Sequence, residues 1–167
     1  MTPEQISLVQ SSFERLGPQL PVMAARFYQE LFRRDPALRS LFATDLTEQQ
    51  ARFAVKLTEL VRAIPRLDEL LIHTRALGAR HAGYGVRAAD YQTVGSALLD
   101  ALAAVLGDGF DGPTRQAWAL AYNLMAETMA AFLDEVDGRY GGVLRWLADN
   151  GFAADDLTSL RAKLLAA

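Results

Sequence analysis

Apolar residues recur at helical spacing along most of this chain. Between residues 47 and 64, apolar side chains stand at three- and four-residue intervals, which places them on one broad helix face. No stretch shows convincingly the alternation with a period of two that marks a half-buried strand. The sequence therefore predicts an all-α chain. The stripe consists of Phe53, Leu57, Leu60, Val61 and Ile64.

Start and stop signals divide this pattern into separate helices. Thr2-Pro3-Glu4-Gln5 supplies an N-cap, a first-turn proline and a capping-box partner. Gly17-Pro18 ends the first helix, and Thr47 is the expected cap of the helix that carries the stripe. The predicted helices cover about residues 3–16, 21–34, 36–42, 47–64, 67–81, 88–107 and 112–135, with two short helices in 138–167.

Composition excludes several classes of function. A chain of 167 residues with 51% hydrophobic content can bury one core, which favours a single compact domain. It has no cysteine, so disulfides, zinc–thiolate sites, iron–sulfur ligation and thiol catalysis are excluded. The formal net charge of −3 offers no basic excess for nucleic acid or an anionic membrane. Without a signal-peptide pattern or a long apolar stretch, we expect a cytoplasmic protein with no membrane contact.

His81 is the residue with the most chemistry. It follows Leu70, Thr74 and Leu77 in one row of a predicted helix. A neutral imidazole can bind iron, and haem iron is commonly held by one histidine on its proximal side. A histidine on an apolar face is, however, more often a hydrogen-bonded core residue. Its spacing alone leaves both interpretations open.

Several ordered segments resemble bacterial single-domain globins and the globin half of flavohaemoglobins. The resemblance covers about residues 1–135. It implies a globin fold, which is a 3-over-3 helical sandwich around haem b, with His81 as the proximal ligand and metal-binding residue. The segments are Phe27-Tyr28-Gln29-Glu30-Leu31-Phe32, Asp35-Pro36 leading to Leu41-Phe42, Leu77-Gly78-Ala79-Arg80-His81 with Gly85-Val86, and Asp90-Tyr91-Gln92-Thr93-Val94-Gly95, continued by Ala117-Trp118 and Ala121-Tyr122.

The same resemblance implies roles on the distal side of the haem. Tyr28 and Gln49 match the tyrosine and glutamine that donate hydrogen bonds to a bound gas. The alternatives are a core tyrosine whose hydroxyl bonds the backbone and a solvated glutamine in the first turn of a helix. Phe42 would stack on the haem. Phe53 stands where the family usually has leucine or valine, so its bulkier ring should narrow or gate the ligand pocket.

On the proximal side and at the haem edge, further matches are implied. Arg52 and Arg80 stand where the family often has basic residues near the haem propionates, although either could be a solvated surface arginine. Val86 should pack on the proximal haem edge, and Tyr91 matches a proximal tyrosine. The glutamate that pairs with this tyrosine in flavohaemoglobins is replaced by Leu133.

The chain departs from the family in other ways too. It has no distal histidine, and we interpret the second histidine, His73, as a surface residue. We expect residues 1–137 to form the globin domain and 138–167 a helical extension. The apolar residues of that extension would fold back on the globin or form a homodimer contact.

Three functional hypotheses follow. The first is reversible binding of O2 and NO, for oxygen storage or for NO detoxification with a separate reductase. In that hypothesis the chain is a nitric oxide dioxygenase only when the reductase is supplied. The second is a haem-based gas sensor or signalling module acting through the extension, and the third is a haem-free structural protein.

Overall fold

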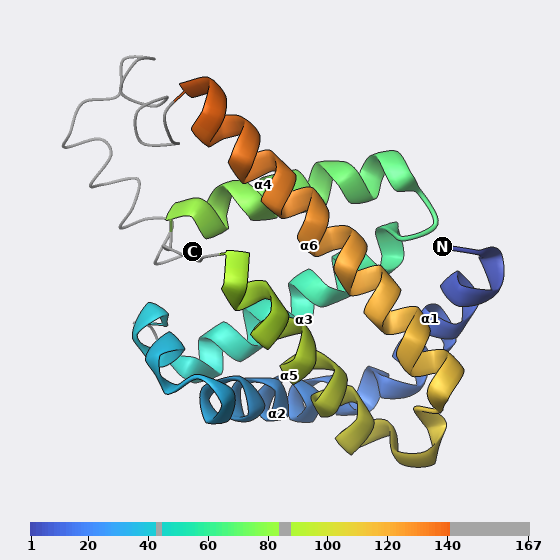
Figure 1. Cartoon of the computed structure of the whole chain (residues 1–167). Coiled ribbons are helices and arrows are strands. Elements are labelled where there is room, and N and C mark those ends of the chain that lie inside the picture. Colours follow the sequence, from blue (N-terminus) through green and yellow to red (C-terminus); the bar gives the residue numbers. More distant parts are fainter. Residues whose placement is uncertain (43–44, 84–87, 141–167) are drawn as a thin grey trace.

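The computed structural model describes the backbone of residues 1–42, 45–83 and 88–140, and side chains there except at 75–76, 79–83, 88–89, 132–133, 136–137 and 139–140 (Figure 1). Every regular element in these ranges is a helix, which confirms the all-α prediction. Most of the predicted extension, residues 141–167, lies outside the described residues. The elements are α1 (Pro3–Leu16), η1 (Gly17–Gln19), α2 (Leu20–Arg34), η2 (Pro36–Leu41), α3 (Leu46–Ala63), α4 (Leu67–Gly83), α5 (Ala88–Leu106), η3 (Gly107–Gly109) and α6 (Gly112–Tyr140).

Side-chain caps set the starts of two early elements. At α1, Thr2 Oγ1 accepts a hydrogen bond from Gln5 N at 3.2 Å, and Gln5 Oε1 accepts one from Thr2 N at 2.8 Å. This reciprocal pair is the predicted capping box. At η2, Asp35 Oδ1 accepts from Ala37 N at 3.0 Å.

The predicted cap of α3 was wrong. The helix begins at Leu46, and Asp45 rather than Thr47 is its cap. Asp45 Oδ1 accepts a hydrogen bond from Thr47 N at 2.8 Å. The short carboxylate stands directly before the first helical residue, where it reaches the unsatisfied N–H groups of the first turn.

The last helix is longer than predicted. The sequence indicated an end near residue 135, whereas α6 reaches Tyr140. Gly138 lies inside the helix and is exposed. A glycine in a helix costs only about 1 kcal/mol relative to alanine, so by itself it does not end one.

The helices pack as three across three. α1, α3 and α4 form one layer, and α2, α5 and α6 form the other. The most extensive contacts join α2 to α5 within one layer, and α4 and α1 to α6 across the two layers. α6 runs the length of the molecule, from α1 at its start to α4 beyond its middle (Figure 1). Within the described ranges, none of the helices is long and apolar enough to cross a membrane.

A buried hydrogen bond joins α1 to α6 inside the core. Trp118 is 1% exposed, and its indole Nε1–H donates to Ser12 Oγ at 2.9 Å. Ser12 is fully buried, and its hydroxyl lies 2.7 Å from the Leu8 carbonyl, to which it donates. The serine therefore satisfies a polar group of the largest core side chain without placing a charge in the core.

Candidate functional site

Four aromatic rings surround the ring of Tyr28, and they belong to α2, to the residue that follows η2, and to α3. Its ring centroid lies 5.3 Å from that of Phe42 and 5.9 Å from that of Phe53, in edge-to-face geometry. Phe27 and Phe32 stand on either side of Tyr28 in α2, with centroids at 5.0 and 5.8 Å. Two consecutive helices and the corner between them thus form one aromatic wall.

Tyr28 and Gln49, which the sequence placed on different helices, come together at this wall. Tyr28 is 2% exposed, and burial raises the pKa of its hydroxyl to about 12, while a side-chain hydrogen bond with Gln49 acts in the opposite direction. Gln49 is half-buried in the first turn of α3. The hydroxyl is therefore protonated at neutral pH and meets the amide of a neighbouring helix.

Phe53 packs on Phe27, a residue of α2. Its ring stacks on that of Phe27, with centroids 4.3 Å apart and an interplanar angle of 2°. Phe53 is half-buried, whereas Phe27 is buried. One face of the Phe53 ring is therefore covered by this stack.

The backbone of α4 is positioned by α6. Gly78 is buried, and a Cβ atom at this position would lie 3.4 Å from the Cα of Met129 on α6. The row that starts at Leu70 and Thr74 faces the core, since both are almost fully buried. Residue 81 continues this row four positions after Leu77. The side chains of His81 and Arg80, and residue Val86 as a whole, lie outside the described residues.

Tyr91 is buried at the start of α5, and a second tyrosine holds its backbone. Burial raises the pKa of Tyr91, and the neighbouring Asp90 charge adds to the effect. Tyr122 on α6 donates from its hydroxyl to the Tyr91 carbonyl at 2.6 Å. The ring of Tyr122 lies directly on Gly95, where a Cβ atom would be only 2.5 Å from Tyr122 Cε1. The sequence match included Gly95 and Tyr122 but gave no sign that they touch.

Leu133, which stands where flavohaemoglobins have the glutamate, lies on the same helix as Tyr122. α6 is unbroken from Tyr122 to Leu133, so these residues are separated by about three full helical turns. The side chain of Leu133 lies outside the described residues, while Asp134 and Glu135 beyond it are exposed.

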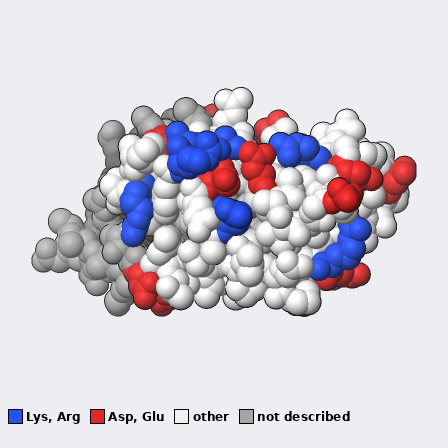
Figure 2. All heavy atoms as spheres, turned by 90° about the horizontal axis from the view of Figure 1, so that it is seen from below, with Lys and Arg blue, Asp and Glu red and all other residues white. Residues whose placement is uncertain are grey.

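The remaining charged candidates lie at the surface of the helices. Arg52 Nη2 lies 2.6 Å from Glu48 Oε1, one turn earlier in α3, and its side chain is 27% exposed. His73 is half-buried, with 34% of its side chain exposed, and its Nε2 lies 3.8 Å from Glu69 Oε1. Figure 2 shows one face of the molecule, on which basic and acidic groups are interspersed among uncharged residues.

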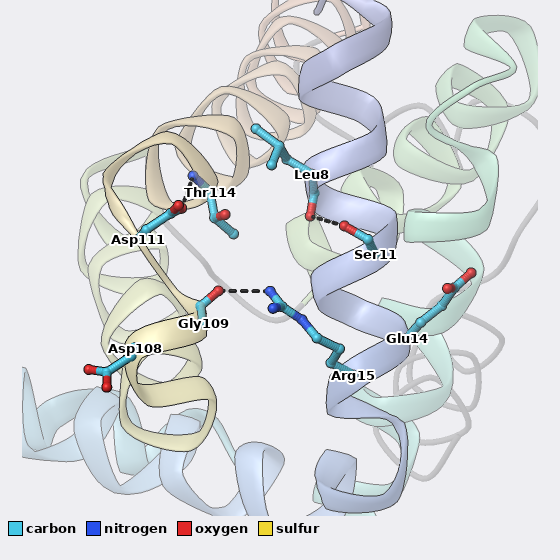
Figure 3. A pocket seen from close by; sticks show the side chains of 8 residues that line it. All are labelled: Leu8, Ser11, Glu14, Arg15, Asp108, Gly109, Asp111 and Thr114. Carbon is cyan, nitrogen blue, oxygen red and sulfur yellow. Dashed lines mark hydrogen bonds between the residues drawn. The ribbon is translucent and has the colours of Figure 1, made fainter.

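A depression of about 650 Å³ lies elsewhere, between α1 and the start of α6 (Figure 3). Arg15 reaches across it and donates to the Gly109 carbonyl at 2.8 Å. Asp111 is exposed there, and its pKa is lowered by hydrogen bonds from the Thr114 side chain and backbone. The depression is wide open to solvent and shares no residue with the Tyr28 wall.

The Tyr28 wall has the chemistry that a haem pocket requires. A neutral phenol and an amide can hydrogen-bond a small polar ligand, and their apolar surroundings exclude competing water. Phe42 and Phe53 remain half-buried and offer aromatic surface to a flat apolar group. These residues fit the haem that the sequence resemblance implies.

Comparisons with known proteins cover most of the chain. A family model described as Globin matches residues 25–129. A flavohemoprotein of Vibrio cholerae is 30% identical over 145 residues, which are 84% of this chain and 36% of that protein. Neuroglobin-2 of Oncorhynchus mykiss is 30% identical over 146 residues, which are 78% of this chain and 91% of that protein. This chain thus spans about a third of the flavohemoprotein it matches.

A solved structure shares the fold. The crystal structure of a hexacoordinated heme protein from an anhydrobiotic tardigrade at pH 4 matches with a TM-score of 0.72 and 16% sequence identity. The match covers 79% of this chain and 94% of that one. At this identity the likeness speaks for the arrangement of the helices alone.

Proposed function

This chain belongs to the globin family, and on that premise we propose that it uses haem b to bind O2 and NO reversibly. Haem b, when bound, supplies an iron centre to which diatomic gases coordinate. The chain's own residues decide how firmly a gas is retained, how large it is allowed to be, and where the haem sits.

The observation that carries this proposal is the pairing of Tyr28 with Gln49 inside the aromatic wall. Tyr28 is buried and protonated, so its hydroxyl has a proton to donate to a gas molecule at the haem face. Gln49 orients that hydroxyl and has an amide N–H that serves as a second donor. A hydrogen bond to a partly charged ligand contributes about 1.5–3 kcal/mol, which slows the loss of O2 about ten- to 150-fold.

Other residues would hold the haem itself. His81 is the proposed iron ligand, supported by its place in the row that faces the core in α4 and by the matching segment around it. Phe42 would stack on the haem, and Val86 would pack on its proximal edge. Arg52 and Arg80 are proposed to reach the propionates, although the contact of Arg52 with Glu48 would compete for its guanidinium.

Firm retention favours oxygen storage or NO detoxification over transport. In NO dioxygenation, NO, O2 and one electron yield nitrate, and the electron must come from outside this chain. The flavohemoprotein relative suggests a reductase as its source, and here the reductase would be a separate protein. The oxidised protein would accept the electron after each turnover.

The visible absorption spectrum tests the proposed iron ligand. We expect purified wild-type protein to show a haem band and His81→Ala to lose haem or to change the band. His73→Ala is the matched control, because His73 contacts Glu69 on the outer part of α4. A colourless wild type, or an unchanged band and haem affinity in His81→Ala, would contradict the assignment.

Stopped-flow measurement of O2 dissociation tests the distal donors. Tyr28→Phe keeps the ring and removes the hydroxyl, so we expect the rate to rise about ten- to 150-fold. Tyr122→Phe is the control, because its hydroxyl bonds the Tyr91 carbonyl instead, and its rate should stay close to that of the wild type. An unchanged rate in Tyr28→Phe would refute the role of the hydroxyl.

A further inference from the structure

The chain leaves helical geometry at Phe42, immediately after η2. Phe42 has φ −113° and ψ 77°, and its carbonyl stands at a helix end where intrahelical donors run out. Arg39, three residues earlier, donates from Nη1 to this carbonyl at 2.6 Å. A side chain thus supplies the hydrogen bond that the helix backbone does not.

The same arginine also contacts α2. Its guanidinium carbon lies 5.5 Å from the centroid of the Phe32 ring, within the range of a cation–π contact. Phe32 belongs to α2 and Phe42 to the corner that follows η2. Arg39 therefore joins two elements at the edge of the aromatic wall.

The two groups that Arg39 touches belong to one triangle of rings. The centroid of Phe42 lies 5.6 Å from that of Phe32 and 5.3 Å from that of Tyr28. Tyr28 and Phe32 close the triangle at 5.8 Å. A shift of the Phe42 backbone would change its contacts with both other rings, including the one that carries the distal hydroxyl.

We propose that Arg39 is a positioning residue, which fixes Phe42 against Phe32 and Tyr28 and thereby holds the face of the haem pocket in place. The part of this inference that concerns haem rests on the proposed function. The part that concerns the corner itself rests on the contacts of Arg39 alone.

Arg33 supplies the contrast. Its side chain is 64% exposed and forms an ion pair with Glu30 on the same helix at 2.8 Å. Such exposed pairs contribute little to stability. Arg39 is also exposed, yet it bridges two elements through a backbone carbonyl and an aromatic face. Both arginines are therefore exposed, but their predicted effects differ.

The first test measures the rate of haem loss to an excess of a haem-scavenging apoprotein. Arg39→Met keeps the aliphatic stem and removes both polar contacts, so we expect haem to leave about five- to tenfold faster. Arg39→Lys keeps a cation for Phe32 and one donor for the carbonyl, and should restore most of the wild-type rate. Arg33→Met should match the wild type.

The second test measures amide hydrogen exchange at Phe42 in the protein as purified. The Phe42 amide donates to the Arg39 carbonyl at 3.2 Å, so its protection reports the order of this corner. We expect Arg39→Met to speed exchange at Phe42 and to leave exchange in the core of α5 unchanged. Arg39→Lys should again be close to the wild type.

The outcomes separate the two proposals. A wild type that binds no haem would end the proposed function, while faster exchange at Phe42 in Arg39→Met would still support the positioning role at the corner. Equal haem loss in Arg39→Met and wild type, or equal acceleration in Arg39→Met and Arg33→Met, would overturn the inference. Unchanged exchange at Phe42 in Arg39→Met would overturn it as well.

Discussion

Gly95→Ala should destabilise the protein, although alanine is the better helix former. The added methyl group would lie 2.5 Å from Tyr122 Cε1 and 2.8 Å from Tyr122 Cδ1. Real Cβ atoms do not approach rings this closely, so either the ring or one of the helices must move. Displacing Tyr122 also breaks the 2.6 Å hydrogen bond from its hydroxyl to the Tyr91 carbonyl.

The magnitude follows from three contributions. Overpacking a well-filled contact costs about 1–3 kcal/mol. Loss of the Tyr122 hydrogen bond costs about 1 kcal/mol more. Replacing glycine with alanine inside a helix returns about 0.5–1 kcal/mol. The net loss is about 1–3 kcal/mol, and a central value of about 2 kcal/mol lowers the melting temperature by about 4–8 °C in a domain of this size.

Gly138→Ala is the matched control, since nothing lies within 4 Å of a Cβ atom there and the residue is also helical. It should raise the melting temperature slightly. Both variants are compared with the wild type by thermal unfolding at the same haem occupancy, because bound ligand adds to apparent stability. If Gly95→Ala stabilises the protein as Gly138→Ala does, the close contact with Tyr122 does not exist. Tyr122→Ala should suppress the penalty of Gly95→Ala in a double-mutant cycle.

Three further predictions concern single side chains. Ser12→Ala strands the buried Trp118 N–H and should lower the free energy of unfolding by about 1–3 kcal/mol in urea titration, whereas exposed Ser11→Ala should change it little; equal effects would contradict the buried bond. The folded-state pKa of Tyr28, about 12, exceeds its unfolded value of 10.0, so its contribution to stability is complete below pH 10 and is lost as pH rises through 12. Tyr28→Phe should remove that loss, and an identical alkaline slope would refute it. Phe53→Leu should improve binding of a bulky alkyl isocyanide relative to CO by about tenfold, and an unchanged ratio would show that the ring does not limit the pocket.

Much of the fold could be predicted because its signals are local. The stripe on α3 and the capping box of Thr2 and Gln5 depend on residues within a few turns of each other. Helix ends are harder to predict, because neighbouring residues such as Asp45 and Thr47 can each serve as the N-cap of the same helix. α6 continues past its predicted end because glycine at position 138 weakens a helix without stopping it.

For the candidate site, the sequence identified the residues but not their contacts. The resemblance pointed to Tyr28 and Gln49, but their hydrogen bond depends on how α2 crosses α3. Nothing in the sequence showed that Phe27 would stack on Phe53, or that Arg39 would reach both Phe32 and the Phe42 carbonyl. Such contacts join residues whose separation in the chain carries no periodic signal.

The sequence by itself determined that this chain is helical, which faces its helices bury, and which residue types stand in the family's positions. Periodicity and capping act over one or two turns, so they can be read along the chain. The tertiary structure decided that Tyr28 and Gln49 meet, and that α5 approaches α6 so closely at Gly95 that Tyr122 lies on its backbone. Those contacts depend on how whole helices pack, because many side chains must fit together in the core at the same time.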